Sequence, residues 1–527
     1  MKNILVTCLK DETNLLQSSH LVTSIAKENP HCEVSILTFS DLESSANLIQ
    51  DARKVFTIDR FKIEHLKSGS LYSDAFALNT LADSLSEVLD TNWNQVVNFG
   101  NDQISAHLIP LLTVEEIAGA HITNYGSVST SDRWSSYANY YRPSNSETQI
   151  EPQTCFHHSA KVPMHHDCAR IKMSQDFSMV ANQNFARIRA SKNGDQGAII
   201  VGINLNESKT GNSFSPETLS DMIETFESSF EYKPVLLTNG SSLEKELVNE
   251  LNRQFGNNLI SVNMDITAAP SVLANLDWLI TKPNRICALA EAMDTNIIET
   301  IVKGETSRTF KEGSFVIQEL TTSHTADDIY FLLNQENQTV IPMGIKNSEN
   351  KVYSRLRDNF GFFKTLIRGP IELKDELNYH ISRNYHYALM GYELDDEILK
   401  SLHEGTNREE LMSYTSQAKE ELTECVKTLL ATLRSLQSVK QSNKNAPRFL
   451  QYMESLMALG KEDILPQAAI SLFEASVENI TSTDFSKNLE DIEKSLFTLK
   501  GDFKILTKIF ENLLSEKSED KRTQEEL

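Results

Sequence analysis

The sequence has few cysteines, a shortage of basic residues and no long apolar run. Its six cysteines are scattered over 527 residues, which excludes the dense framework of a small disulfide-stabilised domain. No stretch approaches the ~20 apolar residues that a membrane-spanning helix needs. Acidic residues outnumber basic ones by 73 to 50, and the formal net charge of −23 argues against a broad nucleic-acid or anionic-lipid surface. We therefore expect neither a nucleic-acid partner nor a membrane span.

The start of the chain favours a cytoplasmic protein. Met1–Val6 runs directly into a strand-like segment, without the apolar stretch and small-residue cleavage site of a signal peptide. Hydrophobic residues make up 40% of the chain and charged residues 23%, which is ordinary for a globular protein with sizeable cores. The length predicts two to four domains at about 100–200 residues each.

Short apolar runs alternate with helical patterns over the first 340 residues. The predicted buried strands are Ile4–Cys8, Val34–Phe39, Val55–Ile58 and Val96–Phe99, and then Ala198–Ile203, Pro234–Thr238, Trp278–Thr281 and Ile297–Val302. The predicted helices between them include Leu15–Glu28, Phe76–Leu89, Pro216–Phe230 and Ser242–Phe255, with Ser215 as an N-cap before Pro216. Alternation of this kind is typical of βαβ units, so two such series predict two Rossmann-like α/β domains with parallel sheets.

The predicted division has four parts. Residues 1–175 form an N-terminal domain with its linker, and residues 196–345 form a second Rossmann-like domain. The polar segment Ser144–Gln196 is predicted to be the connection between them and to contain one or two helices. The strand signal stops near residue 350, so 346–390 is predicted as returning helices and 391–527 as an all-helical extension, with a frayed end at Ser515–Leu527.

One segment of the extension has an unusually regular apolar pattern. From Phe485 to Leu513 apolar residues recur in alternating steps of four and three over about four heptads, the seam of a helix packed along another helix. The seam serves either for docking on its own domain or for self-association and partner binding. A shorter seam from Leu422 to Leu436 is a possible intramolecular mate.

The first β-to-α turn carries the candidate base. In a doubly wound domain, ligands bind at the carboxyl ends of the strands, where Lys10–Asn14 follows the first predicted strand. The turn has no glycine and is therefore neither a dinucleotide fingerprint nor a phosphate loop. Asp11 and Glu12 are candidates for a general base, with stabilisation of the helix N-terminus as the structural alternative.

Three strand-end loops of the second domain carry candidate ligand-binding residues. After the first strand come Asn204, Asn206 and Lys209, and after the next come Asn239 and Glu244. A third strand delivers Lys282, Asn284 and Arg285 to the start of a helix. Two cations beside a helix N-terminus predict an anion site, with a solvated turn as the alternative.

A group of histidines and cysteines in the middle of the chain raises the question of a metal site. The residues are Cys155, His157, His158, His165, His166 and Cys168. Closed zinc sites use tight pairs of ligands, which this spacing does not provide. We predict no metal and no cofactor.

A succession of segments over about residues 3–345 resembles glycosyltransferase family 9, the bacterial heptosyltransferases of lipopolysaccharide core synthesis. In chain order the segments are Ile4–Val6 with Asn14–Leu16, Val96–Phe99 with Ser105–Ala106 and Ile117–Gly119, Met164–Asp167, Val201–Ile203 through Phe214–Pro216, Val235–Glu244, and Ala274–Ile298. The resemblance rests on their order and spacing. It does not extend to residues 391–527.

The resemblance implies a GT-B fold with the active site between two Rossmann-like domains. It also implies inverting transfer of a sugar from a nucleotide-sugar, typically ADP-heptose, to a saccharide or glycolipid acceptor, and a location in the cytoplasm or at the inner membrane. Donor phosphates would then lie at Lys282, Asn284 and Arg285, and the acceptor would enter near Asn14, Asn98 and Ser105.

The sequence departs from the family where this chemistry would occur. Thr13-Asn14 stands where the family has Gly-Asp with the proposed base, Asn212 stands in place of a lysine, and Pro283–Ala288 replaces Asp-Ser-Gly-Pro-x-His. Two functions follow from these observations. One is a divergent glycosyltransferase with Glu12, Asp11 or Asn14 at its catalytic centre. The other is a catalytically inactive GT-B module that binds or scaffolds through its C-terminal helices.

Overall fold

The structure is a computed structural model, and its chain folds as two compact units. It describes residues 2–69, 72–141, 149–165, 171–190, 198–207, 211–229, 231–256, 258–302, 305, 307, 309, 311–319, 324–334, 348–358, 361–370, 373–395, 399, 408–462 and 464–514. Unit 1 comprises residues 1–118 and 156–370, and unit 2 comprises residues 119–155 and 371–527. No helix among the described residues has the length and apolar character that crossing a membrane requires.

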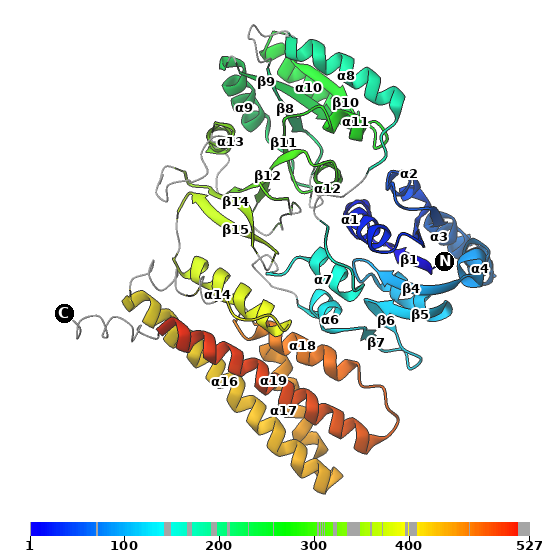
Figure 1. The fold of residues 1–527 in the computed structure, drawn as a ribbon, viewed down its shortest axis with the longest axis vertical. Helices are drawn as coiled ribbons and strands as arrows, with labels where there is room; N and C mark the ends of the chain where they lie inside the picture. Colours follow the sequence, from blue (N-terminus) through cyan, green and yellow to red (C-terminus); the bar gives the residue numbers. More distant parts are fainter. Residues whose placement is uncertain are drawn as a thin grey trace. The chain divides into compact units, whose positions relative to one another are not determined.

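The first half of unit 1 is a Rossmann-like domain built on a five-stranded parallel sheet (Figure 1). Its strands are β1 (Lys2–Thr7), β2 (Cys32–Phe39), β3 (Lys54–Ile58), β4 (Asn92–Asn98) and β5 (Thr113–Ala118). They lie in the order β3-β2-β1-β4-β5, so the topology reverses between β1 and β4. The connecting helices are α1 (Glu12–Glu28), α2 (Glu43–Ala46), α3 (Arg60–Gly69), α4 (Ser73–Asp90) and α5 (Gln103–Leu108), with 3-10 turns η1 (Ser40–Leu42) and η2 (Ile109–Leu111).

The second half of unit 1 repeats this plan on an eight-stranded sheet. Its strands are β8 (Ile199–Asn204), β9 (Tyr232–Thr238), β10 (Ile260–Asn263), β11 (Trp278–Thr281), β12 (Asn296–Val302), β13 (Phe315–Glu319), β14 (Lys351–Asp358) and β15 (Gly361–Arg368). They lie in the order β10-β9-β8-β11-β12-β13-β14-β15, with the first six parallel. The prediction of two Rossmann-like α/β domains is therefore confirmed.

Helices cover both faces of the second sheet. They are α8 (Gln175–Ala190), α9 (Pro216–Ser228), α10 (Ser242–Gln254), α11 (Ala269–Leu273), α12 (Arg285–Ala292) and α13 (Thr325–Leu333). Neighbouring strand residues alternate between the two cores: Ile203 and Ile280 pack with α9 and α13, whereas Ile200 and Leu279 pack with α11 and α12. Because both faces of the sheet are buried, its strands appear in the sequence as continuous apolar runs. The predicted cap of α9 is present, since the Ser215 hydroxyl accepts a hydrogen bond from the Thr218 amide.

The prediction of returning helices over residues 346–390 is wrong for the first part of that range. There β14 and β15 form an antiparallel hairpin that extends the second sheet, and only α14 (Leu373–Leu389) is helical. The hairpin was missed because polar and charged residues interrupt its strands, as Ser354 and Arg355 do within Val352–Arg357, so the continuous apolar run of a buried parallel strand is absent. The signal from apolar runs therefore stops near residue 350 although the sheet continues.

Unit 2 is mainly helical and includes residues that the sequence prediction gave to the N-terminal domain. Its first segment holds the hairpin β6 (Ala120–Ile122) and β7 (Val128–Thr130) and the helix α6 (Arg133–Tyr140). The passage into unit 1 falls within α7 (Pro152–Ser159). After α14 follow α16 (Arg408–Gln441), η4 (Asn443–Asn445), α17 (Ala446–Leu459), α18 (Gln467–Glu478) and α19 (Phe485–Leu514). The helical character predicted for 391–527 is confirmed for its described residues; the predicted frayed end lies outside them.

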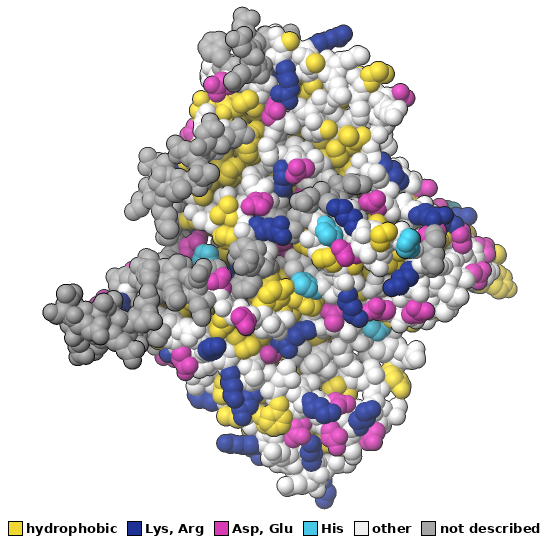
Figure 2. All heavy atoms as spheres, viewed as in Figure 1, with side chains coloured by type: hydrophobic (Ala, Val, Ile, Leu, Met, Phe, Trp, Pro, Cys, Tyr) yellow, Lys and Arg dark blue, Asp and Glu magenta, His cyan; other side chains and the backbone are white. Residues whose placement is uncertain are grey.

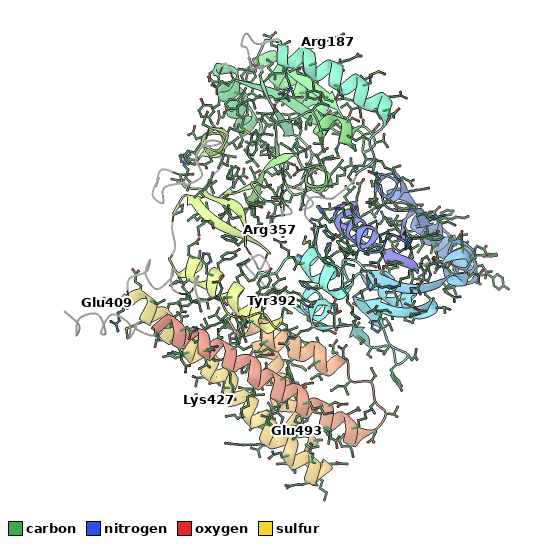
Figure 3. The ribbon with its side chains drawn as sticks, in the orientation of Figure 1. Arg187, Arg357, Tyr392, Glu409, Lys427 and Glu493 are labelled. Atoms are coloured by element: carbon green, nitrogen blue, oxygen red, sulfur yellow. The ribbon has the colours of Figure 1, made fainter. Side chains whose placement is uncertain are left out.

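The heptad seam of α19 is buried inside unit 2. Leu496, Leu499 and Leu506 are at most 1% exposed, and α19 packs along α16, α18 and α14. The partner helix is α16, where Leu422 and Leu436 are buried as the intramolecular alternative predicted. Many positions outside the seam are charged, such as Lys427 of α16 and Glu493 of α19 (Figure 3). Side chains of both charges are interspersed over these helices in the view of Figure 2. The seam that was the candidate for self-association is thus filled by the chain itself.

A buried histidine joins α14 to α6 within unit 2. The His386 ring is 2% exposed, lies against the rings of Tyr137 and Tyr141, and shares a hydrogen bond of 2.9 Å between its Nδ1 and the Tyr137 hydroxyl. Burial lowers the pKa of His386 from its usual 6.5 to about 3, because the charged ring would lose its hydration. The folded protein therefore holds this histidine neutral.

We predict that Leu506→Asp destabilises unit 2 by about 4 kcal/mol or more, because it places an unpaired charge in a fully buried position. Phe497→Asp, on the same helix but 53% exposed, is the matched control and should change the free energy of unfolding by less than ~0.5 kcal/mol. Urea denaturation followed by circular dichroism measures both. Equal midpoints for the two variants would contradict burial of the seam.

We predict that His386 makes stability fall as pH drops from 6.5 towards 3. Between these pH values His386 binds a proton in the unfolded chain but not in the folded one, so the free energy of unfolding decreases as the pH falls. Between pH 7 and pH 5 the wild type should lose about 2 kcal/mol more than His386→Gln. The exposed His65→Gln is the control and should keep the wild-type slope. Parallel slopes for wild type and His386→Gln would refute the assignment.

Candidate functional site

A cavity of about 530 Å³ opens in unit 1 at the carboxyl ends of β1, β8, β9 and β11. These strands flank the points where the strand order reverses, which is where doubly wound sheets bind ligands. The lining residues are Asp11, Glu12, Thr13, Leu205, Asn206, Glu207, Ser213, Asn239, Ser241, Leu243, Glu244, Leu247, Asn284 and Arg285. Loops from both Rossmann-like domains therefore form one pocket. Besides Asp11 and Glu12, five of the predicted donor-binding residues line it: Asn206, Asn239, Glu244, Asn284 and Arg285.

Asp11 is the N-cap of α1. Its carboxylate accepts hydrogen bonds from the Asn14 backbone amide at 2.9 Å and from the Asn14 side-chain amide at 2.8 Å. This is the structural alternative that the sequence offered for the acidic turn. Asn14 is 9% exposed and does not line the pocket, so its amide supports the cap.

Glu12 faces the second domain from the first turn of α1. One of its carboxylate oxygens accepts a hydrogen bond from the Ser45 hydroxyl of α2, and the other lies 2.9 Å from Nη1 of Arg285. The Glu12 side chain is 18% exposed and that of Arg285 is 36% exposed. The candidate base and one predicted phosphate-binding cation are thus paired with each other across the pocket.

Three asparagine side chains are joined at the ends of β8 and β11. Asn284 caps α12 by accepting a hydrogen bond from the Ile286 amide at 3.0 Å. Asn204 donates to Thr281 at 2.9 Å and to Asn284 at 3.3 Å, and its oxygen accepts from the Asn206 side chain at 2.6 Å. The N-terminus of α12, predicted as an anion site, is therefore capped by the chain itself.

Lys282 does not reach the pocket. Its side chain is 2% exposed, and its ammonium group lies 2.5 Å from a carboxylate oxygen of Glu319 and over the ring of Phe214. A buried pair of this kind cannot lose one partner to a ligand without leaving an uncompensated charge. Lys282 thus stabilises the fold of the second domain, and its predicted contact with donor phosphates is not supported. Lys209 lies outside the described residues.

Glu244 lies in the first turn of α10 and lines the pocket with Asn239. Its carboxylate accepts the Asn239 backbone amide at 2.6 Å, and Ser241 caps the helix beside it. Burial raises the pKa of Glu244, while hydrogen bonds from the Asn239 and Gly240 amides and the nearby Arg285 charge oppose that rise. This carboxylate is a hydrogen-bond acceptor at the edge of an apolar wall formed by residues such as Leu243, which is 71% exposed.

The two predicted acceptor-binding residues are buried and lie outside the pocket lining. Ser105 donates from its hydroxyl to Asp102 at 2.6 Å, and the Asn98 amide donates to the Asp102 carbonyl at 3.2 Å. Asp102 also caps α5 and accepts the Leu9 amide at 3.2 Å. These groups therefore hold the turn after β4 against the turn after β1. Their role in binding an acceptor stays a prediction without support from the geometry.

Sequence reasoning missed several residues in or beside the pocket. Ser45 lies on a four-residue helix after β2, and only the three-dimensional fold brings it to Glu12. Glu207 and Ser213 belong to a loop that was considered, but any polar strand-end loop has similar composition. Ser241 belongs to the loop already predicted through Asn239 and Glu244, and its N-cap position before α10 was the local signal for it.

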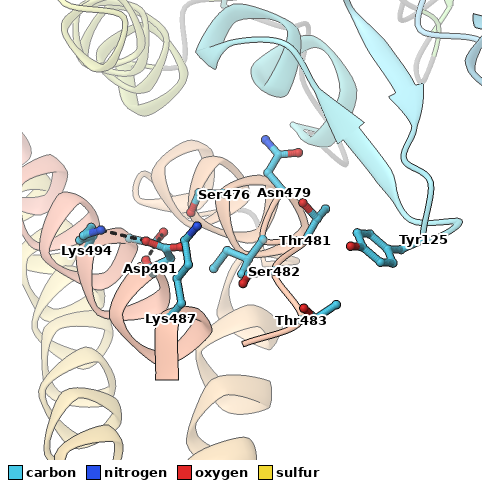
Figure 4. Close-up of a pocket in the computed structure, with 11 residues that line it drawn as sticks. Tyr125, Ser476, Asn479, Thr481, Ser482, Thr483, Lys487, Asp491 and Lys494 are labelled. Carbon is cyan, nitrogen blue, oxygen red and sulfur yellow. Dashed lines mark hydrogen bonds and ion pairs between the residues drawn. The ribbon is translucent and has the colours of Figure 1, made fainter. Parts of the chain in front are cut away.

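A second cavity, of about 600 Å³, lies in unit 2 (Figure 4). It is lined by Tyr125, Ser476, Asn479, Ile480, Thr481, Ser482, Thr483, Lys487, Asp491, Lys494 and Ser495. The side chain of Asn479 forms hydrogen bonds with the backbone of Thr130 in β7. Asp491 forms an ion pair with Lys494 at 2.9 Å. Its side chains are exposed or half-buried and polar, so it is a depression in the solvated surface of the helical unit.

The histidines and cysteines of the middle segment are distributed over separate contacts. His165 pairs with Glu28 at 2.6 Å, and His157 is hydrogen-bonded to Ser24 at 3.3 Å. His166 and Cys168 lie outside the described residues. Among the residues that the structure does describe, no group of three or more potential ligands is suited to a metal ion.

Comparisons with known proteins found similarity among solved structures alone. No protein-family model and no curated protein matches the sequence. Among solved structures, the E. coli heptosyltransferase WaaC with ADP-2-deoxy-2-fluoro heptose is 14% identical with a TM-score of 0.44, over 63% of this chain and 99% of that one. The chain resembles glycosyltransferase family 9.

Two further solved structures have the same kind of similarity. E. coli ADP-heptose lps heptosyltransferase II is 11% identical with a TM-score of 0.44, over 64% of this chain and all of that one. A glycosyl transferase family 9 protein from Veillonella parvula is 12% identical with a TM-score of 0.42, over 57% of this chain and 80% of that one. This likeness concerns the fold, and the function is argued from the residues of the pocket.

We predict that Lys282→Met costs about 3–5 kcal/mol of stability, because Glu319 is left buried without its counter-charge. Adding Glu319→Leu should restore most of that loss. Arg285→Ala is the control and should cost less than ~1 kcal/mol, since its ion pair with Glu12 is partly exposed. Thermal denaturation ranks the variants. Normal stability of Lys282→Met, together with weaker nucleotide binding, would instead support the original phosphate-binding role.

Proposed function

We propose that unit 1 binds a nucleotide-sugar in the pocket at the strand ends, and that the chain is a divergent glycosyltransferase acting on a saccharide or glycolipid. One observation carries this proposal. A carboxylate of the first domain and a guanidinium of the second, Glu12 and Arg285, face one pocket formed by strand-end loops of both domains. The succession of family 9-like segments in the sequence supports the same function.

The walls of the pocket match the parts of such a ligand. Leu205, Leu243 and Leu247 supply an apolar surface for a base or sugar ring, and the Glu244 carboxylate is an acceptor for ring hydroxyls. Arg285 is the one cationic side chain among the described lining residues, and guanidinium groups suit phosphate oxygens. This orientation places the nucleoside on the second domain and the transferred sugar towards Glu12.

Glu12 is the base that this arrangement favours. Asp11 is occupied as the cap of α1, and the Asn14 amide cannot take a proton as a carboxylate can. In the transfer, the acceptor oxygen forms a bond to the anomeric carbon as the bond to the donor phosphate breaks. Glu12 would take the hydroxyl proton, and Arg285 would offset the charge of the departing diphosphate. A lipopolysaccharide acceptor and a cytoplasmic location belong to this proposal.

A catalytically inactive binding module is the second candidate. It is favoured by the internal use of groups that an enzyme would direct at its substrate: Lys282 is paired with Glu319, Asn284 caps α12, and Asp11 caps α1. In this function unit 2 would provide the binding surface for partners. Self-association through residues 485–513 would require the filled seam to open, so other surfaces of the helical unit suit that role better.

Thermal shift with ADP-, UDP-, GDP- and CMP-sugars tests the proposed binding. A ligand at 100 times its dissociation constant should stabilise the fold by about 2.7 kcal/mol. No shift with any of the four classes would favour the inactive module.

We predict that Glu12→Gln abolishes sugar transfer while donor binding persists, because removal of a base lowers the rate by a factor of about 10²–10⁴ without removing ground-state contacts. Asp11→Asn is the comparison, since it retains a capping oxygen and should keep activity. Turnover is measured as release of nucleoside diphosphate from the donor that binds. Full activity of Glu12→Gln would exclude Glu12 as the base.

A further inference from the structure

In the structure described here, both oxygens of the Glu12 carboxylate are occupied. The Ser45 hydroxyl donates to one oxygen, and Arg285 binds the other at 2.9 Å. Each oxygen already accepts one hydrogen bond, so only its remaining lone pair is open to an acceptor hydroxyl. The same contact engages Arg285, so the candidate base and the candidate phosphate-binding group are paired with each other.

The charge of the pocket makes this pairing important for any anionic ligand. Its described lining carries the carboxylates Asp11, Glu12, Glu207 and Glu244 against the single guanidinium of Arg285. An approaching phosphate therefore meets a negative surface unless Arg285 turns towards it. Two backbone amides at the start of α12, those of Ile286 and Cys287, are already taken, because the Asn284 side chain accepts their hydrogen bonds.

The exposure of the ion pairs made by Lys282 and Arg285 of the second domain separates an exchangeable contact from a fixed one. Lys282 and Glu319 are 2% and 6% exposed, so breaking that pair would leave two buried charges without a partner or hydration. Arg285 and Glu12 are 36% and 18% exposed, so water can solvate each partner during an exchange. Arg285 can therefore exchange one oxyanion for another with a small net change in free energy.

We propose that Glu12 occupies the place of the ligand's anionic group on Arg285, and that ligand binding proceeds by exchange of the Glu12 carboxylate for a phosphate. This inference rests on the proposed binding of a nucleotide-sugar and goes beyond it. The exchange frees one oxygen of Glu12 while Ser45 holds the other. It makes Glu12 a specificity-determining residue: ligands with an oxyanion at Arg285 release the base, and neutral sugars do not.

The exchange predicts the direction in which Glu12 variants change affinity. Glu12→Gln removes the competing charge, so it should bind inorganic pyrophosphate and ADP about tenfold more tightly than the wild type. Affinity for adenosine, which has no phosphate, should stay unchanged. Ser45→Ala is the matched control: it removes the other hydrogen bond of Glu12 but leaves Arg285 paired, so it should bind pyrophosphate like the wild type. Combining Glu12→Gln with Arg285→Ala should abolish the gain.

Isothermal titration calorimetry with the full chain measures these affinities. Tighter pyrophosphate binding by Glu12→Gln alone, or binding by this variant when the wild type binds none, supports the exchange. If Glu12→Gln binds pyrophosphate as tightly as the wild type or more weakly, the exchange is overturned. An equal gain in affinity for adenosine also overturns it, because the effect of Glu12 would then be steric. If neither protein binds pyrophosphate or ADP, the exchange and the nucleotide site both fail. If the exchange holds but no sugar is transferred, only the proposed transfer fails.

Discussion

The packing of α1 against α12 is the contact on which the candidate site depends. Leu16 of α1 belongs to the same apolar core as Ile286 and Leu289 of α12, so this core joins the two Rossmann-like domains of unit 1. Residues 13–25 of α1 are all buried, and small polar side chains such as Ser18 and Ser19 permit that close approach. The N-termini of both helices therefore meet at the pocket, which places Glu12 beside Arg285.

Burial then assigns different roles to two cations that look alike in the sequence. Lys282 and Arg285 are three residues apart after one strand, yet the first ends in a closed ion pair and the second at the pocket edge. Glu319, the partner of Lys282, comes from β13, two strands further along the sheet. A charge near a strand end thus becomes available to a ligand only where the fold provides no internal partner.

Local signals in the sequence were sufficient for the parallel core and insufficient for the site. Continuous apolar runs located strands such as Val34–Phe39, and the Ser215-Pro216 pair located the start of α9, because both depend on neighbouring residues. The contact of Glu12 with Arg285 joins residues 273 positions apart, which no local pattern encodes. The β14–β15 hairpin was missed for another reason: charged residues such as Arg355 and Lys364 interrupt its strands, so the continuous apolar run of a buried parallel strand is absent.

The departures from the motifs of the family that the sequence resembles have a common physical consequence. Where the family motif provides a carboxylate and a phosphate loop, this chain has Asn14 as part of a helix cap and Asn284 as another cap. Each replacement satisfies backbone groups that a ligand would otherwise satisfy, so the ligand-free pocket is stabilised. What remains for a ligand is the exchangeable pair of Glu12 and Arg285. In the proposed exchange, nucleotide binding therefore depends on whether a phosphate competes successfully with one carboxylate for one guanidinium, and transfer requires in addition that the released carboxylate acts as a base.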